Sequence, residues 1–338
     1  RCYGRRGKGI MTFEEESITA MKTMENTAVR KISKGTAWRR MVRDDFRFNK
    51  SLYVMILPVI LYFVLFCYFP MYGALIAFKD YQPYLGFIKS PFVGLEHFKQ
   101  FFNSPYFGVI LKNTLVISFS TLVFGFPAPI ILALLLNELK APRYAKFVQN
   151  ITYMPHFVSL VVICGMIKTF TLDTGIINTV LSVFGFEPKS LLNYPKYFVP
   201  IYVISGIWQE VGWGSIIYLA ALTGIDEQLY EAAMIDGAGK WKQLITITIP
   251  GIVPTIVTML ILRVGGILNV GFEKIILLYN DSTASVAEVI TSYVYKKGLL
   301  DQSWSFSAAA GLFNGVINFV FLIVTNYISK KTTEVGLW

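Results

Sequence analysis

The sequence predicts an all-α membrane protein with six transmembrane helices. Hydrophobic residues make up 54% of the 338 residues and charged residues only 15%, whereas soluble domains hold about 25% charged residues. The mean hydropathy of +0.53 agrees with this imbalance. Apolar runs of about 20 residues, the length that a helix needs to cross the hydrocarbon core of a bilayer, recur along the chain. Together these observations argue against a soluble single-domain enzyme.

Six apolar runs meet this length, and they differ in whether a charge interrupts them. Three contain no charged residue: 52–78, 114–136 and 306–328. The other three contain one charged residue each: 151–170 with Lys168, 198–223 with Glu210, and 251–271 with Arg263. Charges at the bilayer centre cost about 2.5–3.5 kcal/mol on insertion scales, so we expect these side chains to face a cavity, a partner or the interface.

The net charge of +10 is interpreted as a signal of topology. Of the 31 Lys and Arg residues, 20 lie in the N-terminal region, the loops after the second and fourth spans, and the C-terminal tail, while nine lie in the alternate loops. Six spans place both termini on one side, and the positive-inside rule makes that side the cytoplasm. We therefore expect a multi-pass cell-membrane protein surrounded by lipid, with no nucleic-acid partner.

Residues 1–50 hold 13 of the basic residues and are predicted to form a cytoplasmic arm before a transmembrane domain over 51–338. Met11 is a natural start, so residues 1–10 are interpreted as an upstream extension. Three separated cysteines and two histidines give neither a disulfide framework nor a metal-ligand spacing. We predict no metal site and no catalytic residues.

The loop between the fourth and fifth spans, residues 226–250, predicts a helix, a turn and a second helix. Asp226 is a suitable N-cap for the first helix. Gly237 and Gly239 permit a sharp reversal because glycine adopts positive φ without steric cost. Pro250 suits the first turn of the next helix. A short helix at the membrane surface transmits force only if a partner holds it from outside the membrane.

The same loop carries Glu231-Ala232-Ala233, then Gly237 after three residues, and Ile247-x-Ile249-Pro250 after nine more. This spacing resembles the EAA loop of ABC importer permeases, with Ile249 where the family usually has Leu. Further segments between Arg47 and Trp338 resemble the polysaccharide-type subgroup of sugar permeases. These segments are 70–73, 77–81, 113–115, 155–159, 271–273 and 293–298.

The resemblance implies a type I ABC importer permease fold in which a cytoplasmic coupling helix docks on a separate ATPase subunit. Here that role would fall to Glu231, Ala232, Ala233, Asp236 and Gly237. The implied partners are two ATP-binding subunits, a second homologous permease subunit, and an extracellular solute-binding protein. The implied cargo is an oligosaccharide or a polysaccharide fragment.

The outer loops would form the docking face for the solute-binding protein. They are residues 79–112, 172–197 and 272–305. The chain lacks the G-x-x-x-x-G-K-[ST] pattern of a phosphate-binding loop, so ATP would be bound by the partner subunits. We therefore expect a transport subunit that is not an enzyme and holds no cofactor.

Glu210 is the deepest charged candidate within a span, and Trp208 and Gln209 precede it. An aromatic ring beside hydrogen-bonding groups is typical of a sugar site, so these three residues and Arg263 are candidates for the substrate pathway. The alternative is a structural ion pair between Glu210 and Arg263. The last span also carries Asn314 and Asn318 among small residues, a pattern that favours helix packing.

Two other classes of function compete with the importer subunit. An autonomous secondary transporter of a polar solute would couple to an ion site among its own spans, but no inverted repeat is visible in the sequence. A membrane-embedded enzyme would need paired carboxylates, a nucleophile motif or a metal set, and the sequence offers none of these.

Overall fold

The computed structural model describes Asp45 and residues 48–338, and these form helices joined by turns. The predicted basic arm, residues 1–50, lies almost entirely outside the described residues. The chain divides into two compact units, Arg1–Tyr72 and Gly73–Trp338.

The first unit contributes one long helical run. It consists of α3 (Lys50–Tyr62), the π-helical η1 (Phe63–Tyr68) and α4 (Phe69–Met71), and it leads into the 3-10 helix η2 (Tyr72–Phe78). No residue of α3, η1 or α4 is buried, although nearly all are apolar. A helix that is apolar on every face is suited to lipid rather than water.

The second unit contains the remaining helices, most of them shorter than a membrane span. They are α5 (Gly86–Lys89), α6 (Glu96–Phe102), α7 (Phe107–Ser120), η3 (Thr121–Gly125), α8 (Pro127–Asn137), α9 (Pro142–Tyr153), η4 (Met154–Phe157), α10 (Leu160–Phe170), α11 (Ile176–Val183), η5 (Leu191–Asn193), α12 (Pro195–Leu222), α13 (Glu227–Ile235), α14 (Lys240–Gln243), η6 (Leu244–Thr248), α15 (Ile249–Gly265), α16 (Phe272–Leu278), η7 (Asp281–Thr283), α17 (Ala284–Ala287), α18 (Ile290–Tyr295), η8 (Lys296–Leu300) and α19 (Trp304–Thr333).

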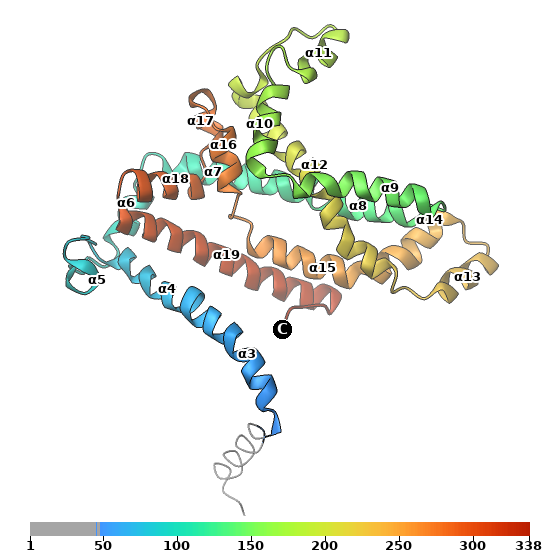
Figure 1. Ribbon diagram of the computed structural model, residues 1–338, viewed down its shortest axis with the longest axis horizontal. Helices are drawn as coiled ribbons and strands as arrows, with labels where there is room; N and C mark the ends of the chain where they lie inside the picture. Colours follow the sequence, from blue (N-terminus) through green and yellow to red (C-terminus); the bar gives the residue numbers. More distant parts are fainter. Residues whose placement is uncertain (1–44, 46–47) are drawn as a thin grey trace, which may run out of the picture. The chain divides into compact units, whose positions relative to one another are not determined.

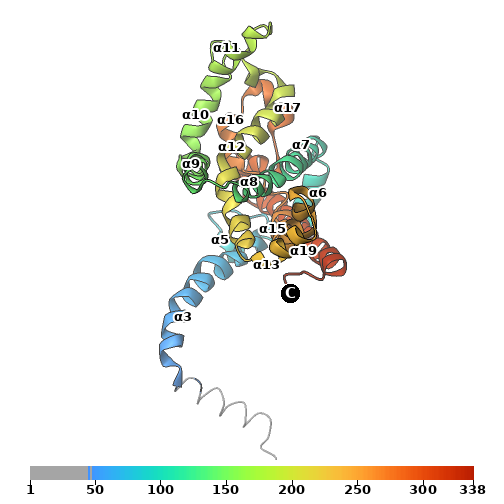
Figure 2. The same ribbon diagram turned by 90° about the vertical axis from the view of Figure 1, so that its right-hand side faces the viewer.

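The helix α12 is the centre of the second unit. It packs against α8, α9 and α15, and α15 packs in turn against α19. Figures 1 and 2 show α15 and α19 side by side, with α10 and α11 projecting on the opposite side of α12. The arrangement places polar residues of α12 between α8 and α15.

Side chains of α7 hold the segment that contains α17 and α18. Asn113 Nδ2 donates hydrogen bonds to the backbone oxygens of Ser285 and Glu288, both at 3.0 Å. Thr114 Oγ1 accepts the backbone N–H of Ile290 at 3.0 Å. These bonds satisfy backbone groups in a segment that has no long helix of its own.

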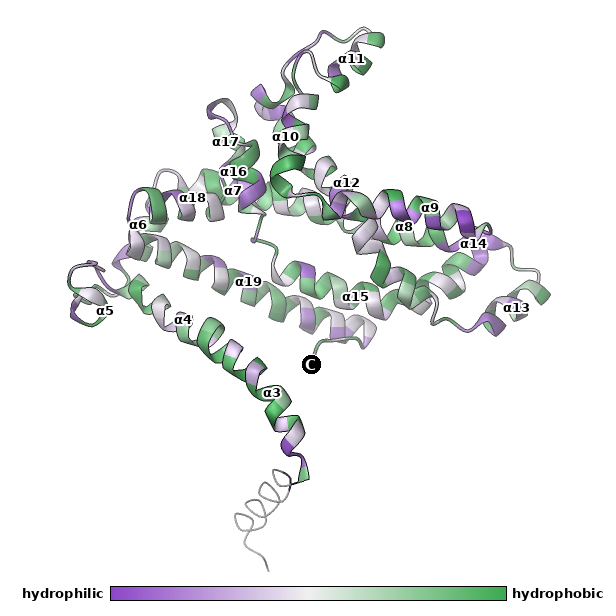
Figure 3. Ribbon diagram, in the orientation of Figure 1, coloured by the Kyte–Doolittle hydropathy of each residue, from purple (hydrophilic) through white to green (hydrophobic). Residues whose placement is uncertain are grey.

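Four helical runs among the described residues are long and apolar enough to cross a membrane. They are Lys50–Phe78, Phe107–Asn137, Lys240–Gly265 and Trp304–Thr333. Figure 3 shows hydrophobic residues along α15 and α19 and hydrophilic residues on α9 and α13. The 28-residue α12 is not among the four, because polar residues such as Gln209 and Glu210 lower its apolarity. The count of six spans therefore stays a prediction.

The structure shows a sharp bend inside the predicted span over 151–170. The helical stretch of α9 and η4 meets α10 at an angle of 100°. Pro155 supplies no backbone donor, and Val158 and Ser159 are extended, with ψ of 135° and 138°. Together the two arms are long and apolar enough for a broken span or a re-entrant loop.

The helical run that contains most of the predicted span over 251–271 has different ends. The helical run begins at Lys240, ten residues before Pro250, and ends at Gly265. Residues 266–271 form no helix and lead into α16. Irregular backbone inside a membrane protein is tolerated where protein buries it or where it lines a cavity.

Three of the π-helical segments lie just before a proline. The pairs are η1 with Pro70, η3 with Pro127 and η6 with Pro250. A proline ring clashes with the carbonyl four residues earlier in an α-helix and lacks the donor that would bond it. The wider π turn makes room for the proline ring and shifts the hydrogen bonds past the missing donor. This explains why the helical run from Lys240 continues through Pro250 without a break.

Glycines allow three close helix contacts in the second unit. A Cβ atom at Gly212 of α12 would lie 2.1 Å from the backbone oxygen of Thr152 on α9. Cβ atoms at Gly214 and Gly265 would meet Pro129 at 3.0 Å and Leu322 at 2.5 Å. The contact at Gly212 involves backbone, which cannot rotate out of the way.

We expect Gly212→Ala to destabilise the protein, because the added methyl group must push α9 away from α12. The matched control is Gly311→Ala in α19, where nothing lies within 4 Å of the new Cβ and alanine favours the helix by about 1 kcal/mol. Thermal unfolding of the detergent-extracted variants checks this. A melting temperature for Gly212→Ala at or above that of the control would contradict the close contact.

Candidate functional site

A cavity of about 490 Å³ lies between α7, α8, α12, α15 and the segment that joins α15 to α16. Most of its lining is apolar. Its polar, charged and tyrosine lining residues are Ser118, Thr121, Tyr202, Gln209, Glu210, Tyr218, Arg263, Asn269 and Lys274. A concave site with apolar walls and a few polar groups is typical of small-molecule binding.

Three of the four residues predicted for the substrate pathway lie in this cavity. Gln209, Glu210 and Arg263 line it, whereas Trp208 does not. The tryptophan that α12 contributes to the lining is Trp213, five residues further along. Because α-helical residues share a face at intervals of three and four, Trp213 lies beside Glu210 and Gln209, and Trp208 does not.

The alternative ion pair between Glu210 and Arg263 does not form. Glu210 Oε2 lies 2.9 Å from Nδ1 of His156, which follows Pro155 in the bend before α10. The His156 ring stacks on Trp213, with ring centroids 4.4 Å apart and planes inclined by 2°. The bend in the chain thus places the His156 imidazole against α12. There it contacts the Glu210 carboxylate, which the alternative interpretation paired with Arg263.

Lys274 was assigned by the sequence to an outer loop, but it is 6% exposed and lines the cavity. Its Nζ donates to the backbone oxygen of Tyr202 at 3.0 Å and lies 4.8 Å from the centre of the Tyr202 ring. A Cβ at Gly206 would lie 3.3 Å from this nitrogen, so the glycine leaves room for the ammonium. One sequence signal was available: a lysine next to the apolar stretch Ile275–Leu278.

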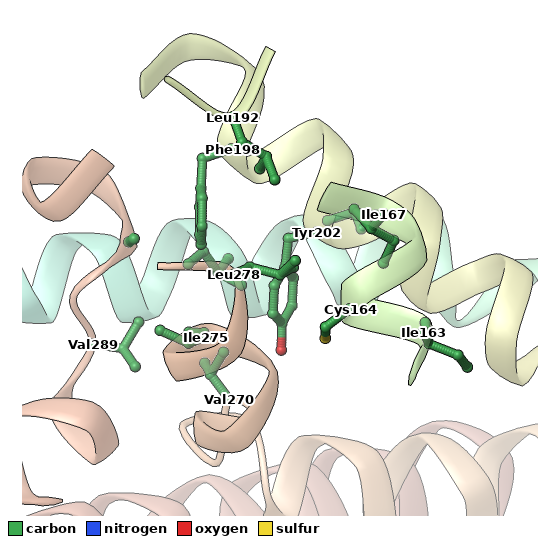
Figure 4. Close-up of a cluster of buried hydrophobic side chains, with 13 residues drawn as sticks. Ile163, Cys164, Ile167, Leu192, Phe198, Tyr202, Val270, Ile275, Leu278 and Val289 are labelled. Atoms are coloured by element: carbon green, nitrogen blue, oxygen red, sulfur yellow. The ribbon is translucent and has the colours of Figure 1, made fainter. Parts of the chain in front are cut away.

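Burial lowers the pKa of Lys274 to about 8, against the opposing effects of Cys164 and Glu210. The residue lies on α16, outside the four candidate spans. Figure 4 shows the Tyr202 ring between side chains of α16, such as Leu278, and side chains of α10, such as Cys164. This apolar cluster explains the desolvation of the ammonium.

The balance of charge in the cavity is positive at neutral pH. Arg263 and Lys274 make no ion pair in the part of the chain that the structure describes, and Glu210 is paired with His156. An anionic group that enters the cavity therefore meets two cations, Arg263 and Lys274, and one carboxylate, Glu210, which is held by His156.

The 226–250 loop forms the helix, turn and helix that its sequence predicts. The Asp226 side chain accepts the N–H of Gln228 at 2.9 Å and caps α13. At the other end, Gly237 has φ +73° and donates to the oxygen of Met234, and Ala238 donates to the oxygen of Ala233 at 2.8 Å. This pair of bonds is a Schellman motif, which needs a left-handed residue at Gly237.

The second glycine of the turn has a different role from the one predicted. Gly239 has φ −68° and precedes α14, so only Gly237 makes the reversal. Tyr230 and Thr248 share a hydrogen bond of 3.0 Å between their hydroxyls, and Lys240 lies 3.2 Å from Glu138 at the end of α8. These contacts hold α13 against η6, and the start of α14 against the end of α8.

The surface of this loop is exposed and partly apolar. Of the residues predicted for coupling, Glu231, Ala232, Asp236 and Gly237 are exposed and Ala233 is half-buried. Two large apolar side chains nearby, Ile235 and Trp241, are 88% and 78% exposed. Large exposed side chains of this kind, rimmed by charges, are typical of a protein-binding surface.

A helical membrane protein with a cavity that holds a few polar groups and an exposed loop of this kind has the features of a transport subunit. Comparison with known proteins defines the class. The chain belongs to the family of binding-protein-dependent transport system inner membrane components, whose sequence pattern matches residues 113–334.

Two relatives from Bacillus subtilis (strain 168) match most of the chain. Protein LplB is 44% identical over 90% of this chain and 95% of its own length. The polygalacturonan/rhamnogalacturonan transport system permease protein YteP is 46% identical over 86% of this chain and 91% of its own length.

A chain in the crystal structure of a bacterial alginate ABC transporter, in complex with an alginate pentasaccharide-bound periplasmic protein, is 43% identical and superposes with a TM-score of 0.81. The match covers 87% of this chain and 99% of that one. A second structure, with a TM-score of 0.80 and 43% identity, is of a bacterial ABC transporter involved in the import of the acidic polysaccharide alginate. The chain is therefore a membrane-embedded permease subunit of a sugar ABC transporter and not an enzyme, as the sequence predicted.

Proposed function

We propose that this subunit imports acidic oligosaccharides, and that the cargo passes along the cavity between α12 and α15. The observation that carries the proposal is the pair of cations, Arg263 and Lys274, with no ion-pair partner among the described residues. Polygalacturonan and alginate, named for two of the similar proteins, are both chains of sugar carboxylates. Guanidinium and ammonium groups bind such carboxylates through charge-assisted hydrogen bonds.

The remaining lining groups suit a saccharide. Trp213 supplies an aromatic face for a pyranose ring, and Gln209 and Glu210 supply partners for hydroxyl groups. We propose these residues with Arg263 as the substrate pathway, and leave Trp208 out because it does not line the cavity. The His156–Glu210 contact holds the carboxylate at one side of the site.

The power for transport would come from two separate ATP-binding subunits, with a second homologous permease completing the pore. The docking surface would be the 226–250 loop, with Glu231, Ala232, Ala233, Asp236 and Gly237 against the ATPase. Its exposed Ile235 and Trp241 support this assignment, because a partner would cover them. An extracellular solute-binding protein would deliver the cargo to the outer loops.

For the membrane topology we propose six spans in the cell membrane, with both termini in the cytoplasm. The four long apolar runs, the bent pair of α9 and α10, and α12 supply the six. The uneven distribution of basic residues supports this orientation.

The charge of the cargo is tested with two saccharides of equal length. We expect the complete assembly in proteoliposomes to take up trigalacturonate at least about tenfold faster than galactotriose, because a charge-assisted hydrogen bond contributes about 1.5–3 kcal/mol. Each saccharide is supplied with ATP inside the vesicles and binding protein outside. Equal uptake of both saccharides would contradict an acidic cargo while leaving the importer class in place.

A pH dependence follows from the ammonium in the cavity. The pKa of Lys274 is lowered to about 8, so its charge is present below pH 8 and is lost as the pH rises through that value. We expect uptake of trigalacturonate to fall above pH 8 in the wild type. Lys274→Arg, which stays charged, is expected to move this fall to higher pH. Superimposable pH profiles for the two proteins would refute a role for the Lys274 charge.

A further inference from the structure

Three asparagine side chains meet where α19 passes residues 266–271. Asn269 Oδ1 accepts hydrogen bonds from Nδ2 of Asn314 at 2.9 Å and from Nδ2 of Asn318 at 3.0 Å. Asn314 and Asn318 are buried, with exposed fractions of 8% and 6%, whereas Asn269 is exposed and lines the cavity. The cluster therefore joins the buried side of α19 to the wall of the cavity.

The backbone fixes which way each amide of the cluster points. The N–H of Leu268 can only donate, and it donates to Asn318 Oδ1 at 2.9 Å. Asn318 must then turn its Nδ2 group toward Asn269, where it needs an acceptor. Asn269 Oδ1 consequently faces α19, and its Nδ2 group has no hydrogen-bond partner among the described residues. The assignment rests on a backbone donor and not on a choice of amide flip.

The cluster keeps this orientation at a cost to α19. Asn314 Nδ2 donates to Asn269, so Asn314 Oδ1 points away from it. This oxygen is buried and has no hydrogen-bond partner in the described part of the chain. An unsatisfied buried acceptor is unfavourable, because it loses its hydrogen bonds to water and gains none in the protein. Two buried amides thus hold one exposed amide in place, and Asn269 Nδ2 is the one amide nitrogen of the three that donates no hydrogen bond among the described residues.

We propose that Asn269 is a fixed hydrogen-bond donor to a hydroxyl or ring oxygen of the saccharide in the cavity, and that Asn314 and Asn318 are its positioning residues. The inference rests on the proposed function, since it takes the cavity as the saccharide site. A donor held in one orientation loses little conformational entropy when it binds, so it adds affinity and selects cargo by the position of an oxygen.

Saccharide retained by the trapped assembly tests this. The complete assembly is trapped with ADP and vanadate in the presence of binding protein, desalted, and its bound trigalacturonate is counted. We expect Asn269→Ala and Asn318→Ala each to lower the bound saccharide about five- to tenfold, as expected for one hydrogen bond. The double variant is expected to lose no more than Asn269→Ala alone, because both changes remove the same bond.

The matched control is Asn326→Ala, a buried asparagine of α19 that accepts the N–H of Leu337 away from the cavity. It is expected to retain wild-type saccharide. If wild type holds saccharide and Asn269→Ala holds as much, the donor role is overturned and the proposed function stands. If wild type traps neither trigalacturonate nor galactotriose, the saccharide cavity is overturned and the donor role with it. Additive losses in the double variant would overturn the positioning role of Asn318.

Discussion

Gly237→Pro is expected to abolish uptake while the protein still inserts in the membrane. Gly237 has φ +73° and donates its N–H to Met234, and proline can provide neither the angle nor the donor. The cost of about 3 kcal/mol or more corresponds to a roughly 100-fold lower population of the native turn. Because the turn ends α13, the proposed docking surface would lose its shape. ATP-dependent uptake and membrane insertion are measured on the same vesicles.

The control for this substitution lies two residues further along the same loop. Gly239 has φ −68°, which is the angle that proline prefers, so Gly239→Pro is expected to keep substantial uptake. A second variant, Glu231→Lys, reverses an exposed charge on α13 without changing the backbone and is also expected to stop uptake. Full uptake by Gly237→Pro or by Glu231→Lys would show that the loop does not couple to the ATPase.

Arg263→Gln is expected to lower uptake of acidic saccharide by about 10- to 100-fold. The guanidinium lines the cavity without an ion-pair partner among the described residues, and removal of a charge-assisted hydrogen bond costs about 1.5–3 kcal/mol. Arg263→Lys keeps the charge and is expected to retain most of the uptake. Initial rates of trigalacturonate uptake at saturating binding protein give the comparison.

Arg143→Gln is the matched control, because Arg143 is exposed on α9 and does not line the cavity. It is expected to transport at the wild-type rate. Equal rates for Arg263→Gln and Arg143→Gln would remove Arg263 from the substrate pathway. The docking loop would be unaffected by that result, since Arg263 lies on α15 and the loop ends at Pro250.

The sequence predicted those elements that depend on residues close together in the chain. Asp226 caps α13 through the residue two positions along, and Gly237 makes its turn within one Schellman motif. Long uncharged runs such as 306–328 form long helices, because an apolar run needs no distant partner to be helical in lipid. The helix that contains Glu231 was predicted for the same reason.

The structure differs from the predictions in segments that depend on contacts between residues far apart in the sequence. The backbone at Leu268 is held by Asn318, 50 positions along the chain, so an apolar run could not indicate that the helix stops at Gly265. Lys274 looks like a loop residue until α16 folds against Tyr202. The segments 155–159 and 271–273 were recognised by family resemblance and not by periodicity, and both contain helix breaks or lie beside one.

His156 shows the same limit within the candidate site. It forms a hydrogen bond with Glu210, and this partner could not be predicted from the sequence. The 100° bend after η4 brings His156 to Glu210. Glu210 is the carboxylate that the sequence offered as a partner for Arg263. A straight helix over 151–170 predicts neither contact.

The most direct test of the central claim compares the chain alone with the complete assembly in liposomes. The chain, its partner permease and two ATP-binding subunits are reconstituted with binding protein outside and ATP inside, and labelled trigalacturonate is counted in the lumen. We predict uptake that requires ATP, binding protein and the intact 226–250 loop, and none by the chain alone. Accumulation by the lone chain under an ion gradient would contradict the account and identify a secondary transporter.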